Sequence, residues 1–383
     1  MPTFSPIPAA CFHILIIDFA HGLSPGTAPR NPLLSLSHEK DITGKERKND
    51  EMRLAVGFNP VLPAAELAKV AEKAERSGYD SIFMHESLYQ RDVVTYLSCA
   101  LNATRTLKAG SGAVNTFTRH PVTLATTFAS LSELSGGRAI LGLGLGSFPT
   151  IPLIGHRIFP VKETRPLKRI KEYIHLLKAI WAGGKVHFSG DFFTVKDLEL
   201  GFKLTYKVPL YIASLSPMTL RFAGMKADGA ILSPTLSTVE GTERMVNWVR
   251  EGENSSNRSI PKASYMMTSL DRDIKQAREA IRGFYFFIYQ LSEVVPAVAL
   301  EKYGVKEETL KPMKEAWKRG DIAEAKRQVP DAAIDALTIT GSPDRAMERV
   351  REYVKVGVDL PILMPIGNVE YAMEAMAPIG KTV

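Results

Sequence analysis

A histidine and a glutamate stand next to each other at the end of an apolar segment, in YDSIFMHESL. Imidazole and carboxylate groups both transfer protons in enzymes, so His85 and Glu86 are candidates for acid–base catalysis. If the segment is a strand, its side chains alternate between two faces, and at most one of the pair points into a site. The alternative roles are a structural histidine and a glutamate whose hydrogen bond orients a cofactor or a loop.

Glycine and polar residues also follow the next apolar segment, in GSGAVNTFTRHPVTLA (110–125). The strand breaks at Ser111-Gly112-Ala113 and passes one asparagine, Asn115. A helix then begins at Arg119-His120-Pro121, where the proline suits the first turn. Arg119 either binds an anion or braces this loop through a salt bridge, and we favour the brace.

Three glycines at a spacing of two residues lie in AILGLGLGSFP, at Gly142, Gly144 and Gly146. This spacing is not the GxGxxG of dinucleotide-binding folds. Within a strand, such glycines either let a flat ligand approach the backbone or only relieve crowding inside a barrel. We favour the ligand interpretation.

The segment ASLSPMTLRFAG places Ser214, Leu215 and Ser216 between an apolar strand and a helix that begins near Pro217. Free N–H groups at a helix start, with two hydroxyls beside them, form an anion-binding site. Ser216 can also act as an ordinary N-cap in front of a proline. The two roles are compatible, so we expect an anion at this turn.

Composition and motifs argue against several classes of function. The chain has 383 residues, 45% of them hydrophobic, as in ordinary soluble globular proteins. Its two cysteines show no zinc or disulfide spacing, so we expect no metal. No P-loop, nucleophile elbow or HExxH motif occurs. The net charge of +7, without a long Lys/Arg run, suits an anionic small-molecule substrate better than nucleic acid.

The candidate residues stand at strand ends in an alternating strand–helix pattern that begins at Met52. Apolar strands are expected in RLAVGFNP, YDSIFMHE, LKAGSGAVN, RAILGLGLGS, VPLYIAS, DGAILS, KASYMMTSL and PILMP, with a further short strand in DALTITG. Eight such units predict an α/β fold, a TIM (β/α)8 barrel, with an open doubly wound sheet as the alternative. In a barrel the carboxyl ends of the strands converge on one mouth, where the candidate residues should meet.

Three segments fall outside this pattern. We predict that residues 1–51 are a flexible N-terminal extension to a barrel at 52–383. KVHFSGDFFTVKDLEL (185–200) has the turn and alternation of a hairpin insertion, and residues 286–333 predict a helical insertion before the last unit. The short apolar run near the N-terminus cannot span a bilayer and follows no basic region. Together with the low cysteine content, this favours a cytoplasmic protein without membrane contact.

Taken in order, these segments resemble the luciferase-like superfamily of flavin- and deazaflavin-dependent barrels, over residues 52 to about 370. GSGAVNTFTRHPVTLA is similar to the third strand of that family, LSELSGGRAILGLGLGS to its fourth, and YIASLSPMTLRFAGMKADGAIL to its phosphate-binding turn. ESLYQRDV and GDIAEAKRQVPDAAIDALTITG resemble the branch that depends on coenzyme F420, and within it the methylenetetrahydromethanopterin reductases. The resemblance implies an F420-dependent oxidoreductase that transfers hydride between the deazaflavin C5 and a substrate carbon.

The resemblance also implies roles for individual residues. A non-prolyl cis peptide bond near Gly112-Ala113, next to Ser111, would lie in a bulge behind the deazaflavin ring. Asn115 would form a hydrogen bond with the ring, and Glu86 stands where the family often has an acidic residue in contact with the cofactor. The residues expected to line the ring or hold the F420 phosphate are Leu145, Gly146, Ser214, Leu215, Ser216, Met218 and Thr219.

The chain departs from the family pattern where catalysis is expected. Ser87 stands where many F420-dependent relatives have histidine, and Gly57 and Ser147 stand where the methanopterin reductases have acidic residues. Leu215-Ser216 occupies a turn that usually carries glycine. The remaining candidate proton donors are His85, Glu86 and Glu163. The alternatives are therefore an FMN-dependent monooxygenase and a flavin- or F420-binding protein without turnover; in each case the superfamily implies a homo-oligomer.

Overall fold

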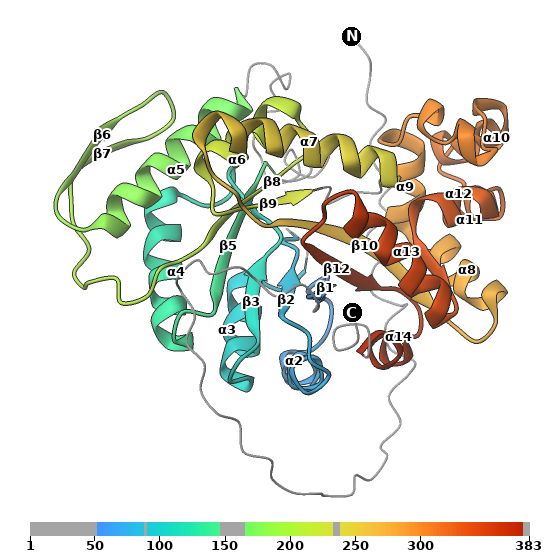
Figure 1. Ribbon diagram of the computed structural model, residues 1–383, viewed down its shortest axis with the longest axis horizontal. Coiled ribbons are helices and arrows are strands. Elements are labelled where there is room, and N and C mark those ends of the chain that lie inside the picture. Colours follow the sequence, from blue (N-terminus) through green and yellow to red (C-terminus); the bar gives the residue numbers. More distant parts are fainter. Residues whose placement is uncertain (1–51, 88–89, 146–164, 233–237, 378–383) are drawn as a thin grey trace, which may run out of the picture.

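The computed structural model describes residues 52–87, 90–145, 165–232 and 238–377, so the predicted extension 1–51 lies outside it. Eight parallel strands form a closed circle, because β12 pairs with β1 and β10 pairs with both β9 and β12. These strands are β1 (Ala55–Phe58), β2 (Ser81–Met84), β3 (Lys108–Ser111), β5 (Ala139–Gly144), β8 (Leu210–Ser214), β9 (Gly229–Leu232), β10 (Lys262–Leu270) and β12 (Leu360–Pro365). The closure confirms the TIM (β/α)8 barrel, and the open doubly wound sheet is wrong (Figure 1).

Helices surround the barrel (Figure 1). They are α2 (Ala64–Arg76), α3 (Val93–Ala103), α4 (Pro121–Ser135), α5 (Pro166–Ala182), α6 (Pro217–Lys226), α7 (Val239–Ser256), α8 (Ile274–Gly283), α13 (Pro343–Lys355) and α14 (Val369–Met376). Local signals define α4, because His120 Nδ1 accepts the Val122 N–H at 3.3 Å and Gly136 ends the helix with φ 65°. No helix in the described ranges is long and apolar enough to cross a membrane.

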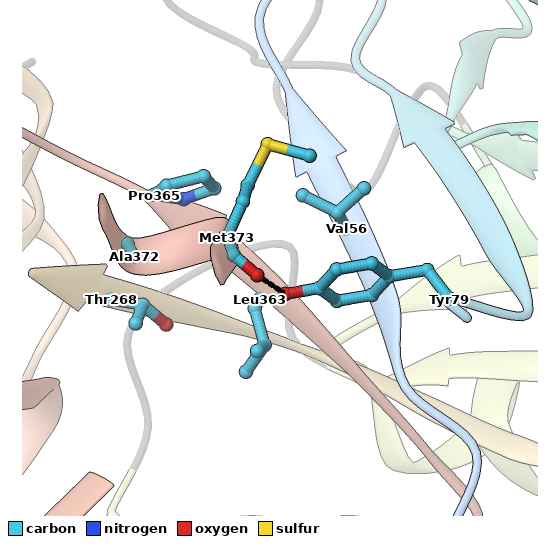
Figure 2. A pocket seen from close by; sticks show the side chains of 7 residues that line it. All are labelled: Val56, Tyr79, Thr268, Leu363, Pro365, Ala372 and Met373. Carbon is cyan, nitrogen blue, oxygen red and sulfur yellow. Dashed lines mark hydrogen bonds between the residues drawn. The ribbon is translucent and has the colours of Figure 1, made fainter. Parts of the chain in front are cut away.

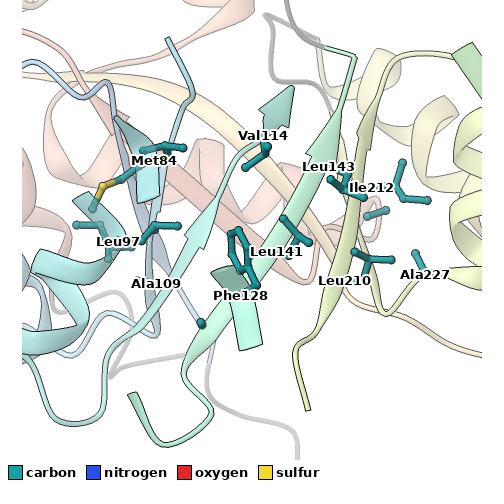
Figure 3. Packing of buried hydrophobic residues seen from close by; sticks show 14 of the residues in the cluster. Met84, Leu97, Ala109, Val114, Phe128, Leu141, Leu143, Leu210, Ile212 and Ala227 are labelled. Carbon is teal, nitrogen blue, oxygen red and sulfur yellow. The ribbon is translucent and has the colours of Figure 1, made fainter. Parts of the chain in front are cut away.

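Strand alternation creates two hydrophobic cores. Leu141 and Leu143 of β5 belong to the outer core, which also holds Leu97 of α3 and Phe128 of α4 (Figure 3). Ile140 of the same strand belongs to the second core, which joins inward-facing strand side chains to α8 and to the helices that follow it in the stretch before the last unit. Full burial of one such side chain contributes about 1.5–3 kcal/mol, so strands buried on both faces supply much of the stability.

The segments outside the β/α pattern add local structure. β6 (Val186–Ser189) and β7 (Thr194–Leu198) form a separate antiparallel pair within the predicted hairpin (Figure 1). The stretch before the last unit holds α9 (Tyr285–Glu293), η2 (Ala297–Ala299), η3 (Glu301–Tyr303), α10 (Glu307–Lys318), α11 (Ile322–Arg327) and α12 (Asp331–Leu337). The short β11 (Ile339–Gly341) then pairs with the end of β10.

The stretch DRDIKQAREAIRGFYFFIYQL forms two helices, α8 and α9, although its residue pattern predicts a single helix. Phe284 separates them with extended backbone, φ −77° and ψ 106°. Gly283 in front of it weakens the helix locally, because glycine gives up more backbone freedom in a helix than other residues do.

A gap too small to hold a water molecule lies where α14 packs on β1, β10 and β12 (Figure 2). Val56, Leu363 and Met373 supply apolar walls. Its one phenol, that of Tyr79, already donates to the Met373 carbonyl at 3.1 Å. An apolar lining without a free polar group marks a packing defect and not a catalytic site.

Candidate active site

A bulge interrupts the third barrel strand between β3 and β4 (Val114–Asn115). It contains a cis peptide bond between Gly112 and Ala113, where the family resemblance implied one. The fully buried Ser111 hydroxyl donates to the Gly142 carbonyl at 3.0 Å and accepts the Gly142 N–H at 2.9 Å. The Ser111 side chain therefore fastens the bulge to β5. We call residues 111–113 the ledge.

Two glycines of β5 make room for the ledge. A Cβ atom on Gly142 would lie 2.1 Å from the Ser111 carbonyl oxygen, and one on Gly144 would lie 3.3 Å from the Ala113 Cβ. At Gly142 the structure shows relief of crowding against the ledge. This is the alternative to the approach of a flat ligand, which we favoured from the sequence. Gly146, the third glycine of the motif, lies outside the described residues.

Glu86 holds the loop that follows the ledge. Its carboxylate, in a side chain 7% exposed, accepts the Asn115 N–H and the Arg119 Nε–H, both at 2.5 Å. It also accepts the Thr118 hydroxyl at 3.4 Å, while Arg119 forms a second ion pair with Asp92. Arg119 is therefore a brace, as we favoured from the sequence. These contacts match the alternative role of Glu86, that of a glutamate whose hydrogen bonds orient a loop.

Asn115 is buried, and its side chain also stabilises this loop. Its Oδ1 accepts the Phe117 N–H at 2.7 Å. Tyr173 of α5 donates to the Thr116 carbonyl at 3.1 Å and also contacts the Arg119 carbonyl. Sequence reasoning missed Tyr173, because nothing local links it to a loop more than fifty residues earlier in the chain.

His85 points into the barrel, whereas Glu86 points toward the loop, as strand alternation predicts. The imidazole stacks on the ring of Tyr265 from β10, with the centroids 4.3 Å apart. Burial lowers the pKa of His85 to about 4, against an opposing hydrogen bond to the Gly112 backbone. His85 is therefore neutral at neutral pH and cannot act there as a cationic acid.

The turn between β8 and α6 carries the second predicted site. The Ser214 hydroxyl accepts the Ser216 N–H at 3.0 Å, so Ser214 shapes the turn. Ser216 occupies the N-cap position, but its side chain makes no capping hydrogen bond. Leu215 and Met218 are exposed, the latter 63%, and Thr219 is buried. The start of α6 thus presents backbone N–H groups that no N-cap side chain accepts.

The ledge and this turn lie close together. A Cβ on Gly144 would contact Ala113 on one side and Ala213, which precedes the turn, on the other. The half-buried Leu145 follows directly after Gly144, at the end of β5. Among the described residues, no group of three or more His, Cys, Asp or Glu side chains gathers to hold a metal.

These features define a class of protein: a closed (β/α)8 barrel with a backbone ledge at the third strand and an uncapped helix start two strands away. The sequence model of the luciferase-like monooxygenase family matches residues 46–360. The chain belongs to this family.

Individual relatives cover most of the chain. It is 31% identical to a 5,10-methylenetetrahydromethanopterin reductase of Methanolobus tindarius, over 87% of this chain and 99% of the relative. It is 30% identical to the protein of that name from Archaeoglobus fulgidus, over 82% of this chain and 94% of the relative. The solved coenzyme F420-dependent tetrahydromethanopterin reductase from Methanopyrus kandleri superposes with a TM-score of 0.76 at 25% identity, covering 86% and 98% of the two chains.

Proposed function

We propose that this protein is a coenzyme F420-dependent oxidoreductase that reduces 5,10-methylenetetrahydromethanopterin, or a methylene pterin of the same class, to the methyl level. The ledge, placed where the family supports a deazaflavin ring, is the observation that carries this proposal. The relatives named as reductases of this substrate support it across nearly their whole length.

The residues present fit a planar, anionic cofactor. Gly112 and Ala113 give the ledge no large side chain, and Gly144 and Ala213 keep the neighbouring strand ends free of large side chains as well. When bound, F420 would supply hydride at C5 of its ring. Glu86 and Arg119 hold the loop beside the ring, and His85 faces the interior as a neutral imidazole. Glu86 is thus a positioning residue in this proposal.

The start of α6 would hold the F420 phosphate. Backbone N–H groups at a helix start carry partial positive charge and bind anions. Ser216 leaves the first N–H groups of α6 without a side-chain cap, and Met218 lies exposed within that first turn. The net charge of +7 also favours binding of an anionic cofactor.

We expect purified protein to bind F420 and to oxidise reduced F420 when 5,10-methylenetetrahydromethanopterin is added. Fluorescence titration measures the first step, and loss of the reduced cofactor measures the second. Tight retention of FMN without F420 binding would instead establish the FMN-dependent monooxygenase. Binding of F420 without turnover on any pterin, alcohol or sugar phosphate would establish a non-catalytic binding protein.

A charge placed in the first turn of α6 tests the phosphate site. Met218→Glu should weaken F420 binding about tenfold, because one carboxylate beside the phosphate repels it at about 1.4 kcal/mol. The helix itself should not suffer, since acidic residues suit its first turn. The neutral Met218→Gln is the matched control. Equal affinities of the two variants would place the phosphate elsewhere.

We further propose a homo-oligomer in the cytoplasm, as the superfamily resemblance and the low cysteine content suggest. Light scattering coupled to size-exclusion chromatography measures the assembly.

A further inference from the structure

The hydroxyl of Tyr265 is buried inside the barrel without a hydrogen-bond partner among the described residues. The residue lies in β10 and is 8% exposed. Buried hydroxyl groups in proteins are nearly always hydrogen-bonded, since leaving one unpaired destabilises the fold. The phenol of Tyr265 therefore has a hydrogen available for a group that binds from outside the protein.

Two glycines, one in β1 and one in the ledge, leave the space that this phenol fills. A Cβ on Gly57 of β1 would lie 2.5 Å from Tyr265 Cε1, and a Cβ on Gly112 would lie 2.0 Å from the hydroxyl oxygen. On a third strand, the His85 imidazole stacks on the ring. The hydroxyl thus lies directly beside the ledge, on its interior side.

Packing alone does not account for the hydroxyl. A phenylalanine would fill the same volume, stack on His85 in the same way and leave no polar atom unpaired. Burial raises the pKa of Tyr265 above its usual value, so the phenol keeps its proton and remains a donor. Two of its neighbours are apolar or neutral: Ile362 pairs with Tyr265 across β12 and β10, and His85 is uncharged at neutral pH.

We propose that Tyr265 donates a hydrogen bond to a carbonyl oxygen or ring nitrogen on the edge of the planar heteroaromatic ring that binds against the ledge. The identity of that ring as F420 rests on the function proposed above. Tyr265 is then a cofactor-binding residue that sets the depth and orientation of the ring in the mouth, and Gly57 and Gly112 are needed because they give its phenol this position.

Tyr265→Phe tests the proposal, with Tyr96→Phe as the matched control. Tyr96 of α3 is a second buried phenol, 2% exposed, whose hydroxyl has no partner in the described part of the chain, but it lies in the outer core. Both variants should melt at the wild-type temperature or above it, because each loses an unpaired polar atom. Only Tyr265→Phe should raise the Kd for F420, by about tenfold, and shift the absorption band of the bound ring.

The outcomes separate this inference from the proposed function. Wild-type affinity in Tyr265→Phe overturns the role of the hydroxyl and leaves F420 dependence standing. A clearly lower melting temperature in Tyr265→Phe overturns it too, because the hydroxyl then has a structural partner. If the wild type binds FMN instead of F420, the proposed function fails, and a Tyr265→Phe variant that binds FMN as tightly as the wild type overturns this inference as well. If neither ring binds, both proposals fail.

Discussion

Replacement of Gly142 by alanine should destabilise the barrel by about 3 kcal/mol, because the new methyl group has no room. Its Cβ would lie 2.1 Å from the Ser111 carbonyl oxygen and 3.1 Å from Ile231 Cδ1. The first neighbour is backbone of the ledge and cannot turn away as a side chain can. Chemical denaturation of the purified variant measures the loss, and the ledge should be displaced in its structure.

The matched control is Gly144→Ala, two residues further along β5 on the same face. There the nearest neighbours are the Ala113 Cβ at 3.3 Å and the Ala213 carbonyl at 3.6 Å, so a small shift makes room. We expect a loss of about 1 kcal/mol or less. Equal stability of the two variants would show that the ledge does not press on Gly142.

Glu86→Gln should lower the affinity for the bound ring about tenfold and the stability by about 2 kcal/mol. The glutamine can still accept the Asn115 N–H, but it loses the charge that holds Arg119. Burial alone would lower the pKa of Arg119, yet the carboxylates of Asp92 and Glu86 keep it above its usual value. The guanidinium thus stays charged, and the loop at Asn115 moves when Glu86 no longer pairs with it.

Asp92→Asn provides the comparison, since Asp92 binds the same guanidinium from a side chain that is 46% exposed. Asparagine can still cap α3 by accepting the Thr95 N–H, and exposed ion pairs contribute little. We expect a stability change within about 1 kcal/mol and unchanged ring affinity. A Glu86→Gln variant that binds the ring as tightly as Asp92→Asn would remove Glu86 from the site.

The opposite side-chain directions of His85 and Glu86 could be predicted from the sequence only in part. Alternation along β2 requires that one faces the interior and the other does not, and the structure agrees. The sequence left the assignment open, because it depends on the rotation of the strand within the barrel. The same holds for Arg119, whose two interpretations were separated only by the positions of Glu86 and Asp92.

Tyr265 marks the limit of that reasoning. In the sequence it is one aromatic residue in the apolar strand KASYMMTSL, and its periodicity is that of any core residue. Its neighbours Gly57 and Gly112 lie more than 150 residues away along the chain. Only the closure of the barrel brings β10 opposite β1, β2 and β3. Gly57 and Gly112 then lie against the ring of Tyr265 that bears the unpaired hydroxyl.

The sequence by itself determined the order of the barrel strands, the closed barrel that they predict and the strand ends that carry the candidate site residues. It did so because apolar periodicity, caps and glycine stops are local properties of the chain. The tertiary structure decided which groups at those ends meet: Ser111 with Gly142, Glu86 with Arg119, and Tyr265 with His85. Register and side-chain direction across strands decide such contacts, and both depend on how the whole barrel packs.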